Sequence, residues 1–196
     1  MARTLLDKPY VGKVIVVAAP SGSGKTTLVR HLLSEISFLD FSTSATSRRR
    51  RPYEQEGKDY YFLTVKAFKS RIEKAHFVEW EEVYENQFYG TLLEEVERLW
   101  DEAKAIVFDV DVKGAISLKE EFQEGALTIF VKPPSLDALE TRLKNRGTEP
   151  PESIKKRITK ASEEMEFLPQ FDTVVVNDDL AEAKEAIKKV ALEFLE

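Results

Sequence analysis

The sequence contains no cysteine and only two histidines among its 196 residues. Without cysteine, a disulfide scaffold and a thiolate metal site are both excluded, and two histidines are too few for a histidine-rich metal site. Any metal ion is therefore expected to be held by oxygen ligands.

Long apolar runs and excess positive charge are also missing. No stretch approaches the roughly 18–20 apolar residues of a membrane span, and the N-terminal segment MARTLLDKPY lacks the apolar core of a signal peptide. The formal net charge of −6 argues against a general nucleic-acid binder. We expect a cytoplasmic protein without membrane or nucleic-acid partners. Hydrophobic residues make up 42% of the chain, which suffices for one domain with a substantial core.

A loop of small residues, 19–27, follows the apolar run VIVVA and precedes the amphipathic segment LVRHLLSEI. It reads APSGSGKTT, and this context of strand, loop, Lys-Thr and helix is typical of a phosphate-binding loop. Gly22 and Gly24 lack a Cβ, so the backbone can turn tightly and direct N–H groups at an anion. Lys25 can then reach the terminal phosphates of a nucleotide, and the Thr26 hydroxyl can ligate Mg²⁺. The alternative is a glycine-rich turn without a ligand.

Residues 48–51 are four consecutive arginines, the densest positive charge in the sequence. Such a run can be a nucleic-acid or localisation patch, a solvated turn, or a clamp on a phosphate group. Its place downstream of the loop, between Ser/Thr residues and Tyr60–Tyr61, favours the clamp, because all of these groups donate hydrogen bonds to phosphate oxygens.

Apolar segments with strand character alternate with amphipathic segments along the chain. Strands are predicted at 14–18 and 105–110, within 127–135 where Pro133–Pro134 end the strand, and within 171–180. Helices are predicted after each of them. This alternation predicts an α/β fold, doubly wound around a mostly parallel sheet.

The segment 65–100 is predicted to be helical, then extended, then helical again. Gly90 breaks the chain, and Thr91 is expected to cap the second helix with Glu94 completing a capping box. The two tryptophans, Trp80 and Trp100, are assigned to the core. Taken alone, Glu79 reads as a surface carboxylate.

Charged residues follow the later strands. Asp109 and Asp111 lie at the end of the predicted strand 105–110, where ligands gather in open α/β sheets and where an acidic residue can serve Mg²⁺. Arg142 and Arg146 share one face of a helix, and Arg157 follows a Gly/Pro-interrupted turn. These arginines predict either a flap that closes over phosphates or an exposed helical hairpin with ordinary surface charge.

An ordered set of motifs resembles the guanylate kinase family over nearly the whole chain, from about residue 12 to 195. The motifs are, in order, APSGSGKTTL, FSTSATSR..RP.E..GKDYYF, F.EW with YGT, DVDVKGA, RLKNRGTE and VVVNDDL. The resemblance implies phosphorylation of GMP by ATP, a P-loop three-layer fold with a five-stranded sheet, and a monomer or homodimer. It further implies one domain with a core (about 12–40, 92–136 and 169–196), a mixed α/β GMP-binding lobe (about 41–91) and a helical lid (about 137–168).

The family's residue roles carry over by position. ATP binding is implied for Ala19, Pro20, Ser21, Gly22, Ser23, Gly24, Lys25, Thr26, Thr27, Asn177 and Asp178. GMP binding is implied for Ser44, Arg48, Arg51, Tyr60, Glu79, Tyr89, Thr91 and Asp111. Catalysis is implied for Lys25, Arg48, Arg142, Arg146 and Arg157, with Mg²⁺ at Thr26 and Asp109 through water.

Two departures from the family pattern bear on the site. Ala19 replaces the usual Gly of the loop, which is acceptable if its φ is negative, and one residue is added before the YGT motif, between Tyr84 and Phe88. Two other functions stay open, a non-catalytic module of this fold that binds phosphorylated peptides and a kinase for another phosphorylated acceptor such as a ribose bisphosphate.

Overall fold

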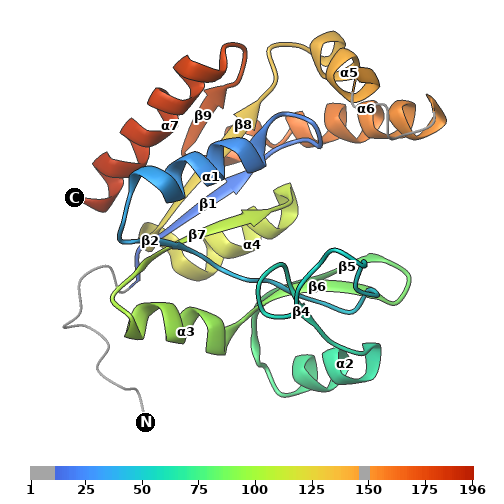
Figure 1. The fold of residues 1–196 in the computed structure, drawn as a ribbon, viewed down its shortest axis with the longest axis vertical. Coiled ribbons are helices and arrows are strands. Elements are labelled where there is room, and N and C mark those ends of the chain that lie inside the picture. Colours follow the sequence, from blue (N-terminus) through green and yellow to red (C-terminus); the bar gives the residue numbers. More distant parts are fainter. Residues whose placement is uncertain (1–11, 146–150) are drawn as a thin grey trace.

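A computed structural model describes residues 12–145 and 151–196. Five parallel strands form the main sheet in the order β2-β7-β1-β8-β9 (Figure 1). Their bounds are Val14–Ala18 (β1), Leu39–Phe41 (β2), Ala105–Val110 (β7), Ala126–Lys132 (β8) and Thr173–Val176 (β9). The predicted α/β class with a mostly parallel five-stranded sheet is confirmed.

A second sheet of four short strands lies beside the first, in the order β4-β3-β6-β5. Its strands are Ala45–Thr46 (β3), Tyr61–Phe62 (β4), Phe77–Tyr84 (β5) and Gln87–Leu92 (β6). The β5–β6 hairpin has a register shift between Glu82 and Tyr84, and Asn86 turns it with a φ of 58°. The residue added before the YGT motif is thus accommodated next to an irregularity in the hairpin.

Among the described residues, seven α-helices lie between or after the strands. They are Lys25–Glu35 (α1), Val65–Glu73 (α2), Leu93–Asp101 (α3), Val112–Phe122 (α4), Leu136–Asn145 (α5), Pro151–Met165 (α6) and Leu180–Leu195 (α7), with 3-10 turns at Gln123–Gly125 and Leu168–Gln170. Within residues 12–145 and 151–196, none of the helices combines the length and apolar composition that a membrane crossing requires.

The central strand β1 shows why the chain forms three layers. Its residues are fully buried, and successive side chains point to opposite faces of the sheet. Ile15 and Val17 pack in one apolar cluster with α1 and α7, whereas Val14 and Val16 pack in another with α3 and α4 (Figure 1). Since all five strands run the same way, their carboxyl ends meet at one edge, where α1 begins.

Two smaller apolar clusters lie away from the main sheet. One joins the second sheet to α2 and consists of Ala45, Phe68, Phe88 and Leu92. The other joins α5 to α6 through Leu139, Leu143, Ile154 and Ala161.

Two predictions around the second sheet were wrong. Thr91 does not cap α3, because it lies in β6 and its hydroxyl donates to Glu79, while Glu94 accepts a hydrogen bond from Arg71. Trp80 is 47% exposed, since strand alternation turns it away from the face that carries Glu79. Trp100 is partly buried, packs against the core cluster as predicted and meets Phe122 edge-on.

Candidate active site

The phosphate-binding loop joins β1 to α1 as the sequence predicts. Gly22 and Gly24 have φ angles of 99° and 93°, in the left-handed region that glycine adopts at little cost. Gly24 caps α1, so the loop's N–H groups and the positive end of the helix dipole face the same space.

Ala19 begins the loop as a core residue. Its φ is negative and only 7% of it is exposed, because its methyl group belongs to the apolar cluster beneath α1. The condition for Ala in place of Gly is therefore met.

A cavity of about 310 Å³ lies over the loop. Lys25 contributes its ammonium, which forms a 2.5 Å ion pair with Asp109 and also donates to the carbonyl of Val110. The hydroxyl of Thr26 lies 3.5 Å from the same carboxylate. Described loop residues that line this cavity are Ala19, Pro20, Ser21, Gly22, Gly24, Lys25, Thr26 and Thr27. Ser23 is instead fully buried.

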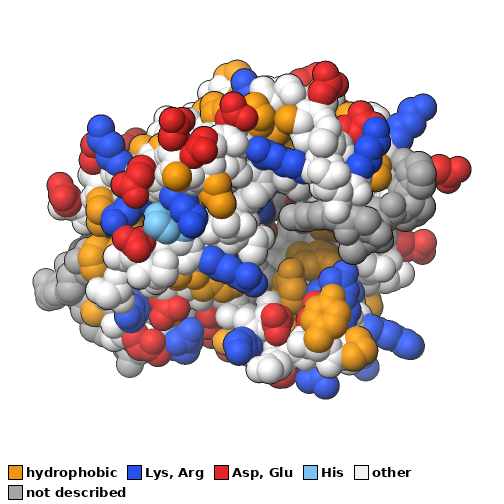
Figure 2. All heavy atoms as spheres, turned by 45° about the horizontal axis from the view of Figure 1, so that its top comes forward, with side chains coloured by type: hydrophobic (Ala, Val, Ile, Leu, Met, Phe, Trp, Pro, Cys, Tyr) orange, Lys and Arg blue, Asp and Glu red, His pale blue; other side chains and the backbone are white. Residues whose placement is uncertain are grey.

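A second cavity of about 320 Å³ adjoins the first and lies between the two sheets. Five predicted GMP-binding residues line it, namely Ser44, Tyr60, Glu79, Tyr89 and Asp111. Lys25 and Asp111 line both cavities, so a group bound in one can reach a group bound in the other. Figure 2 shows a hollow in this face of the molecule with Lys and Arg side chains at its edge.

Glu79 is a partly buried acid in the wall of the second cavity. Its carboxylate accepts a 2.7 Å hydrogen bond from Thr91. Burial raises the pKa of Glu79 to about 7, and the hydrogen bond from Thr91 opposes that rise. The surface location that the residue suggests when taken alone is wrong, because strand β5 turns this side chain toward α4.

Arg48 does not line the second cavity itself but contacts Tyr60, which does. Its guanidinium donates to both carboxylate oxygens of Glu54 at 2.7 and 2.6 Å. It also lies over the ring of Tyr60, 4.9 Å from the centroid, and Tyr60 packs edge-on against Tyr89. The two parallel hydrogen bonds to Glu54 and the contact with the Tyr60 ring fix the orientation of the Arg48 guanidinium. Its positive charge lies beside the phenol groups of Tyr60 and Tyr89.

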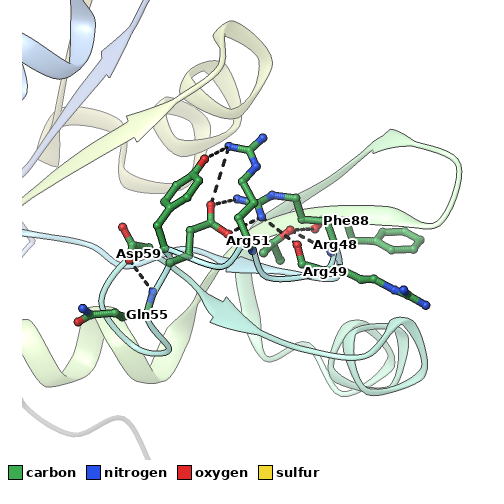
Figure 3. A network of polar contacts seen from close by, with 9 residues as sticks. Arg48, Arg49, Arg51, Gln55, Asp59 and Phe88 are labelled. Carbon is green, nitrogen blue, oxygen red and sulfur yellow. Dashed lines mark hydrogen bonds and ion pairs between the residues drawn. The ribbon is translucent and has the colours of Figure 1, made fainter. Parts of the chain in front are cut away.

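Arg51 lies in the same network but points outward. Its backbone N–H donates to Glu54 at 2.8 Å, while its guanidinium is 60% exposed and donates to the hydroxyl of Tyr53 (Figure 3). The structure therefore brings the predicted phosphate-binding groups of Arg48, Tyr60 and Tyr89 together but leaves the Arg51 side chain at the rim.

The predicted lid arginines contact the donor side. Arg157 of α6 donates to the hydroxyl of Ser21 in the loop, and Arg142 of α5 donates to the backbone carbonyl of Asn177 at 2.8 Å. Arg146 lies outside the described residues. The predicted ATP-binding pair behind the loop differs in exposure, since Asn177 is buried and Asp178 is exposed.

Sequence reasoning missed several acidic residues around the site. Glu54 stands in the RP.E motif but was given no role, and Glu81 lies two residues after Glu79 on the same strand face, a spacing that could have revealed it. Glu95 is buried, and its carboxylate accepts hydrogen bonds from the backbone N–H of Thr43, the hydroxyl of Tyr61 and the guanidinium of Arg98. Lys160 and Glu164 of α6 also line the loop cavity.

The described site offers oxygen atoms as possible metal ligands. No group of three or more His, Cys, Asp or Glu side chains among residues 12–145 and 151–196 is arranged to hold a metal ion. The neighbouring hydroxyl of Thr26 and carboxylate of Asp109 are hard donors of the kind that Mg²⁺ accepts when phosphate oxygens complete its shell.

Comparisons with known proteins agree with this geometry. The family model described as Guanylate kinase matches residues 11–193. A guanylate kinase of Bacteroides thetaiotaomicron is 50% identical over 96% of this chain and 92% of its own length, and one of Chlorobaculum tepidum is 41% identical over 99% and 97%. The crystal structure of guanylate kinase from Anaplasma phagocytophilum superposes with a TM-score of 0.72, at 27% identity, and covers 95% of this chain and 87% of its own.

Proposed function

The chain belongs to the guanylate kinase family, and we propose on this premise that its two adjoining cavities hold ATP and GMP for phosphoryl transfer. The enzyme moves the terminal phosphoryl group of ATP to the phosphate of GMP and releases ADP and GDP. The observation that carries the assignment is that Lys25 and Asp111 line both cavities.

The loop cavity is the donor site. Backbone N–H groups of residues 19–27 and the amino end of α1 bind the phosphates of ATP. Lys25 neutralises negative charge on the terminal phosphoryl group while that group is transferred. Thr26 and Asp109 would hold Mg²⁺, partly through water, and the ion would neutralise phosphate charge when it is bound.

The second cavity is the acceptor site, and Glu79 reads the base. Guanine presents two adjacent donors, the N1–H and the 2-amino group, and one carboxylate can accept both. Adenine lacks this pair of donors, so bound AMP would leave the remaining acceptor positions of the partly buried Glu79 unsatisfied, at a cost of about 1–3 kcal/mol or more. Ser44 and Thr91 supply hydroxyl groups beside the same carboxylate.

Arg48, Tyr60 and Tyr89 bind the phosphate of GMP, with Arg51 joining from the rim. Two observations support this role: the three residues lie close to one another, and both tyrosines line the cavity that Lys25 also lines. The acceptor phosphate needs no strong base, because the protein mainly aligns the reactants and neutralises charge. Arg142, Arg146 and Arg157 are assigned to that neutralisation from the lid, where an arginine can contribute roughly 10³–10⁵ in rate.

The three regions of the proposed division carry separate apolar clusters. The acceptor lobe, about 41–91, contains most of the cluster around Phe68, and the lid, about 137–168, contains the cluster around Leu139.

Because the substrates are purine nucleotides, we place the reaction in purine nucleotide recycling. The proposed location of the enzyme is the cytoplasm.

An acceptor panel tests the assignment. A coupled assay of ADP formation with GMP, AMP, UMP and ribose bisphosphate should show turnover with GMP far above the rest. Preference for ribose bisphosphate would indicate a different small-molecule kinase. No turnover with any acceptor, together with binding of a phosphorylated peptide, would indicate the non-catalytic module.

A further inference from the structure

Asn177 follows the last residue of β9 and reaches the phosphate-binding loop from behind. Its side chain is 5% exposed, and its amide Nδ2 donates a 2.7 Å hydrogen bond to the backbone carbonyl of Ser23. Ser23 is itself fully buried, so this contact is shielded from water. A buried carbonyl left without such a partner would destabilise the loop.

The loop also packs tightly on the same amide one residue later. A Cβ added at Gly24 would lie 2.2 Å from Nδ2 of Asn177, closer than any side chain allows. The backbone of Gly24 therefore fits directly against the amide, and the contact fixes two consecutive loop residues.

The planarity of the peptide bond gives this contact a consequence for the donor site. The carbonyl of Ser23 and the N–H of Gly24 belong to one trans peptide unit, so they point in opposite directions. When Asn177 holds the carbonyl on the buried side, the N–H is directed to the other side of the loop. Gly24 lines the loop cavity. The amide of Asn177 therefore sets the direction of an N–H group at the proposed phosphate site.

The backbone of Asn177 is anchored to two further elements. Its N–H donates to the carbonyl of Lys132 at the end of β8, and its carbonyl accepts from Arg142 of α5, both at 2.8 Å. The side chain thus projects from a fixed position between the sheet and α5.

We infer that Asn177 is a positioning residue that orients the phosphate-binding loop through the Ser23 carbonyl, and that it does not read the base of the nucleotide donor. This inference rests on the proposed use of the loop for ATP. A positioning role predicts that loss of the amide weakens every ligand that uses the loop's N–H groups. A base-reading role predicts a loss only for ligands that carry adenine.

The test compares Asn177→Leu, which keeps the size but removes the donor, with Asn177→Asp, a near-isosteric variant that replaces the donor by an acceptor. Calorimetry in Mg²⁺ measures Kd for ATP, for inorganic tripolyphosphate, which has no base, and for GMP, and thermal unfolding gives Tm. Val176→Thr, an exposed neighbour on β9, is the matched control.

We expect both variants to lose ATP and tripolyphosphate affinity by the same factor, about 10- to 100-fold, with GMP affinity unchanged. If Asn177→Leu fails to fold, Asn177→Asp provides the same comparison. A loss confined to ATP, no loss in either ligand, or an equal loss for GMP would each overturn the inference. Absence of GMP phosphorylation by the wild-type protein would instead refute the proposed function.

Discussion

Thr91 and Glu79, on neighbouring strands of the second sheet, share a 2.7 Å hydrogen bond in the wall of the acceptor cavity, which Glu79 lines while Thr91 is fully buried behind it. The bond uses one of about four acceptor positions on the carboxylate and holds the group in place. Glu79 therefore retains the capacity to accept the two N–H donors of guanine.

Replacing Glu79 by Gln should selectively impair GMP use. The amide turns one acceptor into a donor, which then faces a guanine donor. We expect kcat/KM for GMP to fall by about 100-fold, equivalent to about 2.7 kcal/mol, with little change in ATP affinity. Steady-state kinetics with each substrate varied would measure this, and Glu85→Gln, an exposed residue of the same hairpin, serves as control. Equal losses for ATP and GMP would count against base reading by Glu79.

The raised pKa of Glu79 predicts that GMP binding depends on pH. Below its pKa of about 7 the group is protonated and cannot accept both guanine donors. GMP affinity should therefore fall as pH decreases below 7, by up to about tenfold per pH unit. Binding near pH 7 should release protons, because the guanine donors favour the charged carboxylate.

Calorimetry at several pH values, in buffers with different ionisation heats, would detect both effects. The GMP phosphate also titrates, and the Glu79→Gln variant serves to separate its contribution from that of Glu79. The variant should lack the part of the pH dependence and of the proton release that comes from Glu79. A wild-type profile identical to that of the variant would show that this carboxyl does not titrate in the binding reaction.

The same pKa predicts how stability changes with pH. Since the folded-state pKa of Glu79 lies above its ordinary value, its contribution to stability is full below about pH 4.5 and is lost as pH rises through 7. The loss should approach about 3 kcal/mol at pH 8. Urea unfolding of the wild type and of Glu79→Gln at pH 5 and pH 8 would measure it. If the difference between the two proteins does not change with pH, this prediction is wrong.

Replacing Glu54 by Gln should weaken GMP binding through Arg48. Glu54 is 7% exposed and holds both the Arg48 guanidinium and the Arg51 backbone, and Arg48 in turn holds the pKa of Glu54 at about 2. Without the carboxylate, Arg48 loses its fixed orientation. We expect KM for GMP to rise about 10- to 100-fold while KM for ATP stays constant.

The control for this variant is Glu73→Gln, which removes an exposed charge from α2 in the same lobe. Guanosine, which lacks the phosphate, separates the two halves of the acceptor site. Its weak binding should be equal in the wild type and in Glu54→Gln. A parallel loss of guanosine and GMP binding would mean that Glu54 supports the whole lobe.

Replacing Lys25 by Ala should abolish activity and leave the fold intact. The residue lies at the first turn of α1, 18% of its side chain is exposed, and it is the loop's cation facing both cavities. We expect a decrease in kcat of about 10³-fold or more, with an unchanged circular dichroism spectrum and retained GMP binding. Turnover at the wild-type rate would refute the role assigned to Lys25.

Features encoded by local sequence were predictable. The apolar run of β1, the glycines of the loop and the amphipathic pattern of α1 lie next to one another, so periodicity and turn chemistry sufficed to place them. Ser135 caps α5 through an equally local contact, with its hydroxyl accepting from the N–H of Ala138 at 3.0 Å. In each case the interacting residues are a few positions apart.

Features that depend on distant partners were not predictable. The strands β3 and β4 have two residues each and exist only because β3 pairs with β4 on one side and with β6 on the other. Thr91 follows the local rule for a helix cap, yet the strand places its hydroxyl against Glu79. The contact between Asn177 and Ser23 spans 154 positions, and no local pattern encodes it.

The path of the chain between β2 and β7 has a consequence for how acceptor choice can change. These strands are hydrogen-bonded neighbours, with Leu39 opposite Ala105, yet the whole second sheet lies between them in the sequence. The chain leaves the main sheet after Phe41, forms the second sheet, and returns to the main sheet through α3. One continuous stretch of a gene therefore encodes most of the proposed acceptor site, and recombination could exchange it while the proposed ATP site stays untouched.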